Sequence, residues 1–164
     1  MATINLSAYD SAKVPSAKDM KFGIVVSEWN AEITANLLKG AQNTLLKHGT
    51  KEENITVKHV PGSFELPLGA QFLLEYTNID AVICLGCVIQ GETKHFDFVC
   101  EGVSQGIKDV ALKYNKPVIF GVLTDNNIGQ SQSRSGGKHG NKGDEAAVSA
   151  IKMVAVQKEI RSSN

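Results

Sequence analysis

One stretch of the chain, residues 81–102 (AVICLGCVIQGETKHFDFVCEG), limits the possible folds more than any other. It opens with a continuous apolar run rich in Val and Ile, which is typical of a β-strand buried on both faces. After residues 90–93 the pattern changes, and apolar side chains recur at the spacing of one helix face, at Phe96, Val99, Val103 and Ile107. A buried strand that leads into a helix predicts a parallel sheet, and such sheets bind ligands at the carboxyl ends of their strands. His95 stands at this turn, so we expect the chemistry there.

Three more apolar segments have the length and residue types of strands, at residues 21–26, 55–60 and 117–123. Helical patterns follow each of them. Asn30 predicts the N-cap of the first helix and Gly49 its end. A short polar helix over residues 128–134 precedes a long one that starts at residue 142 or 144 and ends near residue 160. Strands that alternate with helices in this way predict a three-layer α/β/α domain with a four-stranded parallel sheet.

The composition fits one globular domain and argues against several classes of protein. Apolar residues make up 42% of the 164 residues, and 17 basic side chains balance 17 acidic ones. This balance argues against a general nucleic-acid surface or a polybasic membrane surface, and no apolar run approaches the roughly 20 residues of a membrane span. Residues 1–20 are polar and lack the core of a secretory signal. We expect them to form a flexible arm, followed by a single domain over residues 21–164.

The chain has three cysteines, Cys84, Cys87 and Cys100. An odd number of cysteines without a secretory signal favours a cytoplasmic protein with reduced thiols. Cys84 and Cys87 have the spacing of a redox or zinc motif, but three positions along a strand place them on opposite faces, and no second Cys or His pair completes a site. We therefore expect buried structural thiols and no metal.

Polar and aromatic residues follow three of the predicted strands, where the ends of parallel strands meet. Trp29 and Asn30 follow the first strand, residues 63–65 (Ser-Phe-Glu) the second, and residues 90–95 the third. Trp29 is either a packing aromatic or a platform for a planar ring. Residues 63–65 either begin a helix or hold a polyhydroxylated ligand. By itself, His95 is more often a helix cap or a surface residue than a catalytic group.

A glycine-rich basic segment, residues 135–143 (SGGKHGNKG), follows the short polar helix. It is either a mobile linker or a phosphate site, because glycine-rich backbone N–H groups and cations both favour anions. Arg134 or Lys142 would then add a positive charge to the site at the strand ends. Taken together, the residues predict a site for a planar substrate that carries a polyol and for a phosphorylated one.

Five segments allow a more specific identification. In chain order they read GIVVSEWN, VPGSFELP, LGCVIQGETKHFDFV, PVIFGVLT and GGKHGNKGDEAA. Together they closely resemble the lumazine synthase family over residues 22–160, and PGSFELP followed at this distance by GETKHFDFV is highly specific. The resemblance implies a flavodoxin-like strand order, 2-1-3-4, and a transferase of the penultimate step of riboflavin biosynthesis. Such an enzyme condenses 5-amino-6-(D-ribitylamino)uracil with 3,4-dihydroxy-2-butanone 4-phosphate to 6,7-dimethyl-8-ribityllumazine, releasing phosphate and water.

The resemblance also implies the roles of individual residues. His95 matches the general acid–base. Trp29 matches the aromatic that stacks on the pyrimidine, Arg134 the arginine that pairs with phosphate, and Phe120 an aromatic that closes the pocket from a neighbouring subunit. The full set of implied substrate-binding residues is Trp29, Asn30, Ser63, Phe64, Glu65, Cys87, Val88, Ile89, Glu92, Thr93, Phe120, Arg134 and Lys142. No metal or organic cofactor is implied.

Two positions depart from the family pattern. Several relatives carry a basic residue where Gln90 stands and a small residue where Glu92 stands. A carboxylate repels a phosphate, so we expect Glu92 to offer its backbone N–H group while its side chain points away.

The resemblance implies a homo-oligomer with its sites between subunits. A cyclic pentamer is the smallest active unit expected. The absence of an insertion between Arg134 and Lys142 favours further assembly into a 60-subunit icosahedral capsid, with an enclosed riboflavin synthase as a candidate partner. Two rival functions are considered. The first is a protein without catalytic activity, either a flavin or lumazine binder or a purely structural shell. The second is riboflavin synthase itself, which handles the same product. His95 together with Arg134 argues against the first rival, and the absence of an internal repeat argues against the second.

Overall fold

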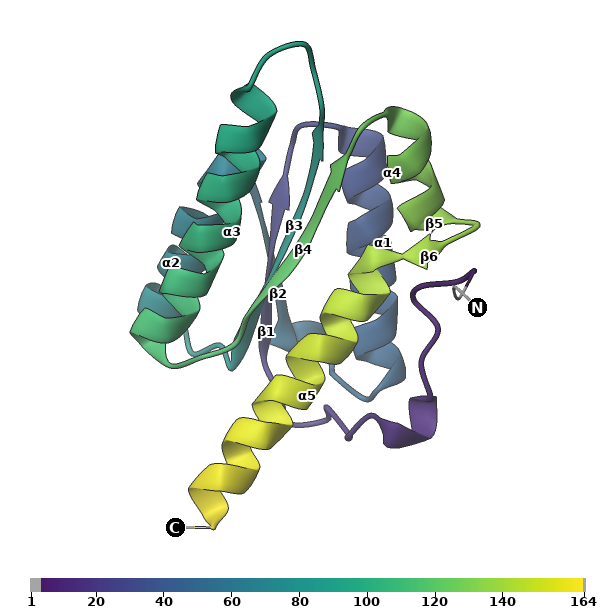
Figure 1. Cartoon of the computed structure of the whole chain (residues 1–164). Coiled ribbons are helices and arrows are strands. Elements are labelled where there is room, and N and C mark those ends of the chain that lie inside the picture. The colour runs from purple at the N-terminus through teal and green to yellow at the C-terminus, as the bar shows by residue number, and fades with distance from the viewer. Residues whose placement is uncertain (1–3, 164) are drawn as a thin grey trace.

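The computed structural model describes residues 4–163 as a parallel sheet covered by helices on both faces (Figure 1). The sheet has four strands in the order β2-β1-β3-β4, which confirms the predicted flavodoxin-like order. Its strands are β1 (Phe22–Ser27), β2 (Ile55–Val60), β3 (Ala81–Ile89) and β4 (Val118–Asp125). All three pairings are parallel, so the carboxyl ends of the strands share one edge of the sheet.

Two pairs of helices form the outer layers, and each covers its own apolar core. Helices α1 (Ala31–Lys47) and α5 (Lys142–Ser162) pack on one face, and α2 (Leu66–Tyr76) and α3 (His95–Tyr114) pack on the other (Figure 1). The short helix α4 (Ile128–Arg134) leads from β4 toward the layer of α1 and α5. The predicted three-layer α/β/α architecture is therefore confirmed.

The central strand β3 supplies alternate side chains to the two cores, as its period of two requires. Ile83 and Leu85 face α1 and α5, whereas Val82 and Cys84 face α2 and α3, and all four are fully buried. Cys87 belongs to the first core and Cys84 to the second, so the prediction that these two thiols lie on opposite faces is confirmed. Burial raises the pKa of the Cys84 thiol far above its ordinary value.

The glycine-rich segment after α4 is not a loop. It forms a small antiparallel hairpin of β5 (Ser135–Gly137) and β6 (Gly140–Asn141). Gly136 and Gly140 have φ angles of +107° and +88°, which are readily adopted only by glycine and allow the chain to reverse. The side chain of Asn141 then accepts a hydrogen bond from the N–H of Gly143 at 2.8 Å and caps α5.

Residues 4–20 lie along their own chain rather than extending away from it (Figure 1). Val14, Ala17 and Met20 are buried in the core between the sheet, α1 and α5. The N–H of Ala17 donates to the carbonyl oxygen of His48 at 2.8 Å. The polar composition of this segment does not reveal that these three side chains complete the core. The short helices η1 (Ser11–Lys13) and η2 (Glu52–Asn54) complete the connections around α1.

Two classes of feature are absent from the part of the chain that the structure describes. Among residues 4–163, no helix is both long enough and apolar enough to span a membrane. In the same residues, no group of three or more His, Cys, Asp and Glu side chains is arranged to hold a metal ion.

Candidate active site

A cleft of about 630 Å³ opens at the carboxyl ends of β1, β2 and β3. Four elements form it: the turn after β1, the short helix η3 (Ser63–Glu65), the end of β3 and the first turn of α3. Its lining residues are Trp29, Asn30, Gly62, Ser63, Phe64, Glu65, Cys87, Val88, Ile89, His95, Phe98 and Val99. Most of the predicted site residues therefore meet in one place, although they come from distant parts of the sequence.

A second groove, of about 760 Å³, runs between α1 and the β5–β6 hairpin. It is larger than the cleft, but it is lined mainly by polar and charged side chains and by none of the predicted site residues. The cleft is the better candidate because it lies at the carboxyl edge of the sheet and combines apolar walls with a few polar groups.

Three aromatic side chains form the rim of the cleft. Trp29, Phe64 and Phe98 are 72%, 60% and 68% exposed, which is unusual for side chains that gain so much from burial. The sequence analysis missed Phe98. Its position three residues after His95 places both side chains on one face of α3, and that spacing was the available signal. The aromatic rim offers surfaces on which a planar ring can stack.

Asn30 occupies the N-cap position of α1 but does not cap the helix with its side chain. Its backbone is left-handed, with a φ angle of 56°, and its amide nitrogen Nδ2 donates to the carbonyl oxygen of Cys87 at 2.9 Å. The prediction that Asn30 is the N-cap residue of the first helix is therefore confirmed, but its side chain makes no capping hydrogen bond, because the left-handed backbone directs the amide toward β3. Asn30 instead fixes the end of the strand that forms the floor of the cleft.

A chain of polar groups continues from Cys87 to the far side of the sheet. The Cys87 thiol donates to Ser131 Oγ at 3.3 Å, and the Ser131 hydroxyl donates to Asp125 Oδ2 at 2.7 Å. Burial, and secondarily the charge of Asp125, raise the pKa of the Cys87 thiol, although the hydrogen bond with Ser131 acts in the opposite direction. A thiol in this state is a poor nucleophile. Cys87 therefore contributes its backbone to the cleft while its side chain anchors α4.

His95 is the first residue of α3 and is exposed at the mouth of the cleft. Its backbone N–H donates to Thr93 Oγ1 at 3.3 Å, so the threonine hydroxyl helps to begin the helix. Within residues 4–163, no hydrogen bond or ion pair holds the imidazole ring. Glu92 and Thr93 are exposed just before the helix and do not line the cleft.

Ser63 is the one buried polar side chain of η3. It is 6% exposed, and its hydroxyl has no hydrogen-bond partner among the described residues. The hydroxyl lies against Gly86, where an added Cβ would come 2.5 Å from Ser63 Oγ and 2.9 Å from Leu66 Cδ1. The lack of a side chain at Gly86 therefore allows η3 to approach β3 and sets the depth of the cleft.

We expect Gly86→Ala to displace η3 and to lower both stability and turnover. Overpacking of this kind costs about 1–3 kcal/mol of unfolding free energy, and the loss appears as a lower Tm in thermal unfolding. Gly91→Ala is the matched control for stability, because a Cβ at Gly91 meets no atom within 4 Å. Equal Tm values for the two variants would contradict the packing role of Gly86.

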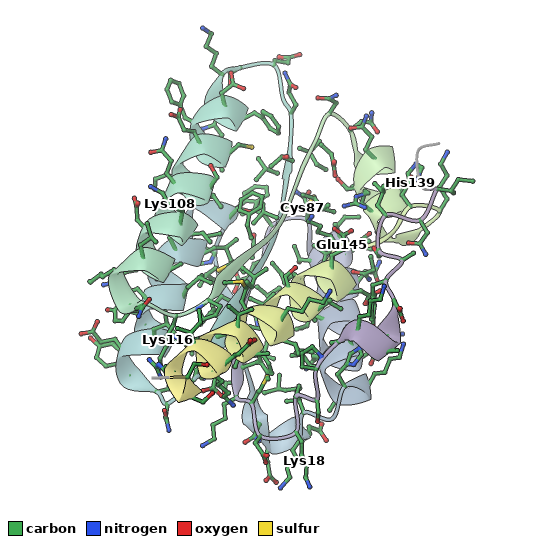
Figure 2. The ribbon with its side chains drawn as sticks, turned by 60° about the horizontal axis from the view of Figure 1, so that its bottom comes forward. Lys18, Cys87, Lys108, Lys116, His139 and Glu145 are labelled. Carbon is green, nitrogen blue, oxygen red and sulfur yellow. The ribbon has the colours of Figure 1, made fainter. Side chains whose placement is uncertain are left out.

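Besides Glu92 and Thr93, three further predicted site residues do not line this cleft. Arg134 and Lys142 lie beyond the opposite face of the sheet, where Arg134 Nη2 and Lys142 Nζ each form an ion pair of 3.0 Å with Glu145. Figure 2 shows Glu145 on the first turn of α5, with His139 farther out on the hairpin. Phe120 is half-buried on β4 and packs against the core beneath α2 and α3. A single chain therefore presents the aromatic and imidazole part of the predicted site in one cleft and its cationic part elsewhere.

Comparison with known proteins identifies the family of the chain. The family model described as 6,7-dimethyl-8-ribityllumazine synthase matches residues 19–158. A protein of that name from Parabacteroides distasonis is 61% identical over 92% of this chain and 94% of its own length. Its counterparts from Cytophaga hutchinsonii and Flavobacterium johnsoniae are 62% and 58% identical, over 92% and 98% of this chain and 94% and 84% of their own lengths. The chain therefore belongs to the 6,7-dimethyl-8-ribityllumazine synthase family.

Proposed function

We propose that this protein forms 6,7-dimethyl-8-ribityllumazine from 5-amino-6-(D-ribitylamino)uracil and 3,4-dihydroxy-2-butanone 4-phosphate, with release of phosphate and water. One observation carries the proposal beyond family membership: an exposed imidazole, His95, stands at the mouth of a cleft whose rim is aromatic. Aromatic surfaces suit the planar uracil, and an imidazole is the side chain best suited to moving protons near neutral pH.

The residues of the cleft divide between the parts of the first substrate. Trp29 stacks on the pyrimidine, with Phe64 on the same rim. The backbone of residues 87–89 reads the polar edge of the uracil ring, since the end of a strand leaves N–H and C=O groups available there. Ser63, Glu65 and Asn30 hold the ribityl hydroxyls. The unpartnered hydroxyl of Ser63 supports this assignment, because a buried polar group gains most from a hydrogen-bonding ligand.

The reaction needs several proton transfers, and His95 is placed to perform them. The 5-amino group attacks the ketone, and loss of water gives an imine. Phosphate then leaves by β-elimination, the ribitylamino nitrogen attacks the remaining carbonyl carbon, and loss of a second water completes the second ring. A base takes a proton in some of these steps and an acid returns one in others, which a single imidazole can do in turn. Holding the two substrates side by side supplies much of the remaining acceleration.

The phosphate requires cations that the cleft of one chain lacks. We infer that Arg134 and Lys142 of a neighbouring subunit supply them, together with Phe120 as part of the wall. The backbone N–H groups at the start of α3, next to Glu92 and Thr93, favour the same anion. The Glu92 side chain is exposed, in keeping with the expectation that it points away from the phosphate.

Exposed apolar side chains support an assembly of several subunits. The layer of α2 and α3 exposes Leu68, Phe72, Tyr76, Phe98 and Leu112, each more than half exposed, and such patches mark interfaces. We propose a cyclic pentamer as the active unit and further assembly into a 60-subunit shell, with an enclosed riboflavin synthase as a candidate partner. Light scattering that finds only pentamers would contradict the shell.

Three free thiols, of which two are buried, support a cytoplasmic location.

The direct test is formation of the lumazine, followed by absorbance and fluorescence against the uncatalysed rate. The rival function, a non-catalytic flavin or lumazine binder, predicts binding without turnover. Binding itself can be followed separately, because Trp29 is the chain's single tryptophan and a ring stacked on it quenches its fluorescence. Quenching by the lumazine without product formation would favour the binder.

A further inference from the structure

Residues 4–7, here named the N-terminal strap, lie on the β5–β6 hairpin of their own chain. The Leu6 N–H donates to the carbonyl oxygen of His139 at 3.0 Å. The ring of His139 makes a second hydrogen bond to the strap. Its Nδ1 lies 2.7 Å from the carbonyl oxygen of Ile4, and because a carbonyl oxygen can only accept, Nδ1 is the donor. The Ser7 hydroxyl lies 2.8 Å from the carbonyl oxygen of Asn141. The strap thus contacts the turn of the hairpin and the strand β6.

The hairpin is shaped to receive the strap. A Cβ built at Gly140 would collide with Asn5 Oδ1 and Ser7 Oγ, and its φ angle of +88° is also one that only glycine adopts readily. Asn5 Oδ1 accepts the Ser7 N–H at 2.9 Å and holds the strap in a compact turn. Ser7 is 8% exposed, so its hydroxyl is directed inward at this contact.

Ser7 also reaches the charged groups assigned to phosphate. Its Oγ lies 3.2 Å from Glu145 Oε1, the same oxygen that pairs with Arg134 Nη2 at 3.0 Å. The other oxygen, Oε2, pairs with Lys142 Nζ at 3.0 Å. Arg134 Nη1 approaches the His139 carbonyl oxygen at 3.4 Å, and that carbonyl also accepts from the strap. The strap therefore contacts both groups that hold Arg134, the Glu145 carboxylate and the His139 carbonyl oxygen. Lys142 is held by the second oxygen of the same carboxylate.

The charges leave this cluster able to bind an anion. Arg134 and Lys142 carry two positive charges and Glu145 one negative charge, so one positive charge remains. The guanidinium has five N–H donors, and its two printed contacts leave the others available for phosphate oxygens. An ion pair that is only partly exposed, as here, holds its side chains more firmly than one in open solvent. What decides phosphate affinity is then whether Glu145 keeps a fixed position between the two cations.

We propose that the N-terminal strap positions the phosphate-binding cations, and that Ser7 is the positioning residue. By donating to Glu145 Oε1 or to Asn141 O, the Ser7 hydroxyl holds the carboxylate and the hairpin in one arrangement. Without it, the carboxylate is free to follow Arg134 and to compete with the phosphate for the guanidinium. The proposal rests on the proposed function, since it takes Arg134 and Lys142 to be the phosphate ligands, but it adds a residue outside the cleft and outside the family motifs.

The test is steady-state kinetics of Ser7→Ala on the assembled enzyme, with inorganic phosphate as a competing anion. Ser7 acts on the phosphate only through Glu145, so its loss predicts a rise of about three- to tenfold, the size of one ordinary hydrogen bond, in the KM for the butanone phosphate and in the Ki of inorganic phosphate. We expect kcat and the KM for the ribitylaminouracil to change less than about twofold, because the strap touches no residue of the cleft. Ser11→Ala is the matched control. It is the same substitution at an exposed serine shortly after the strap, and the Ser11 side chain makes no contact with the hairpin in the described structure.

A double-mutant cycle separates positioning from general stability. If Ser7 acts through Arg134, adding Ser7→Ala to Arg134→Ala raises the KM for the butanone phosphate no further. An unchanged KM in Ser7→Ala alongside a strong effect of Arg134→Ala would overturn the strap proposal and leave the proposed function intact. An equal change of all kinetic parameters, with a lowered Tm, would also overturn it. An unchanged KM in Arg134→Ala would overturn the phosphate assignment and the strap with it.

Discussion

His95→Ala is expected to lower kcat by about 100-fold or more, which is the usual contribution of a positioned general acid–base. The imidazole stands at the mouth of the cleft, and among the described residues the other ionisable side chains that line it are the Glu65 carboxyl and the buried Cys87 thiol. Binding of either substrate relies on other groups, so the KM values should change little. The measurement is initial rates of lumazine formation, with the uncatalysed rate subtracted.

The control for this prediction is His59→Ala, which removes an exposed histidine of β2 that does not line the cleft. We expect it to retain the full rate. Added imidazole should restore part of the rate of His95→Ala, because a free base can enter an open cleft. A kcat within threefold of the unmodified enzyme in His95→Ala would rule out an acid–base role for this residue.

Arg134→Ala is expected to raise the KM for the butanone phosphate by about 10- to 100-fold, since hydrogen bonds between ionised groups contribute about 1.5–3 kcal/mol. The KM for the ribitylaminouracil should stay within about twofold, because Arg134 does not line the cleft that holds this substrate. Arg134→Lys should recover part of the affinity, as an ammonium keeps the charge but loses the paired N–H geometry.

Lys138→Ala is the matched control for Arg134→Ala. Lys138 lies in the hairpin that directly follows Arg134, is exposed, and makes no ion pair within the described residues. A nonspecific effect of positive charge near the site would raise the KM in both variants. An effect confined to Arg134 would support a specific contact with the phosphate.

Much of the fold could be predicted because its signals are local. The apolar run of β3 and the helical spacing after it predicted the central βα unit, and the structure confirms both. The opposite orientations of Cys84 and Cys87 follow from the period of a strand, which no tertiary contact overrides here. Helix α4 was also predicted with its observed ends, Ile128 and Arg134.

The parts that could not be predicted depend on contacts between distant residues. Asn30 has the residue type of a cap, but its amide turns to the Cys87 carbonyl because its backbone is left-handed. The glycine-rich segment becomes a hairpin because Gly136 and Gly140 permit reversal and Asn141 caps the next helix. The link from Cys87 through Ser131 to Asp125 joins residues up to 44 positions apart. None of these contacts leaves a trace in the local pattern.

The candidate site also has a part that the sequence predicted and a part that it did not. Residue types at strand ends predicted the cleft, because parallel strands bring those ends together. The family resemblance implied sites between subunits, but it did not say whether Arg134 lies beside His95 in the same chain. In the structure, the cleft with His95 and the cationic cluster with Arg134 lie on different faces of one chain, and only the folded chain reveals this separation.

The measurement that tests this account most directly is complementation between two impaired variants. His95→Ala and Arg134→Ala are co-expressed in equal amounts, and the mixed oligomers are assayed for lumazine formation at a low concentration of the butanone phosphate. If each site takes His95 from one subunit and Arg134 from its neighbour in a ring, about a quarter of the interfaces carry both residues. We therefore predict recovery of roughly a quarter of the unmodified activity at this substrate concentration. Activity no higher than the mean of the two separate variants would contradict a site shared between subunits.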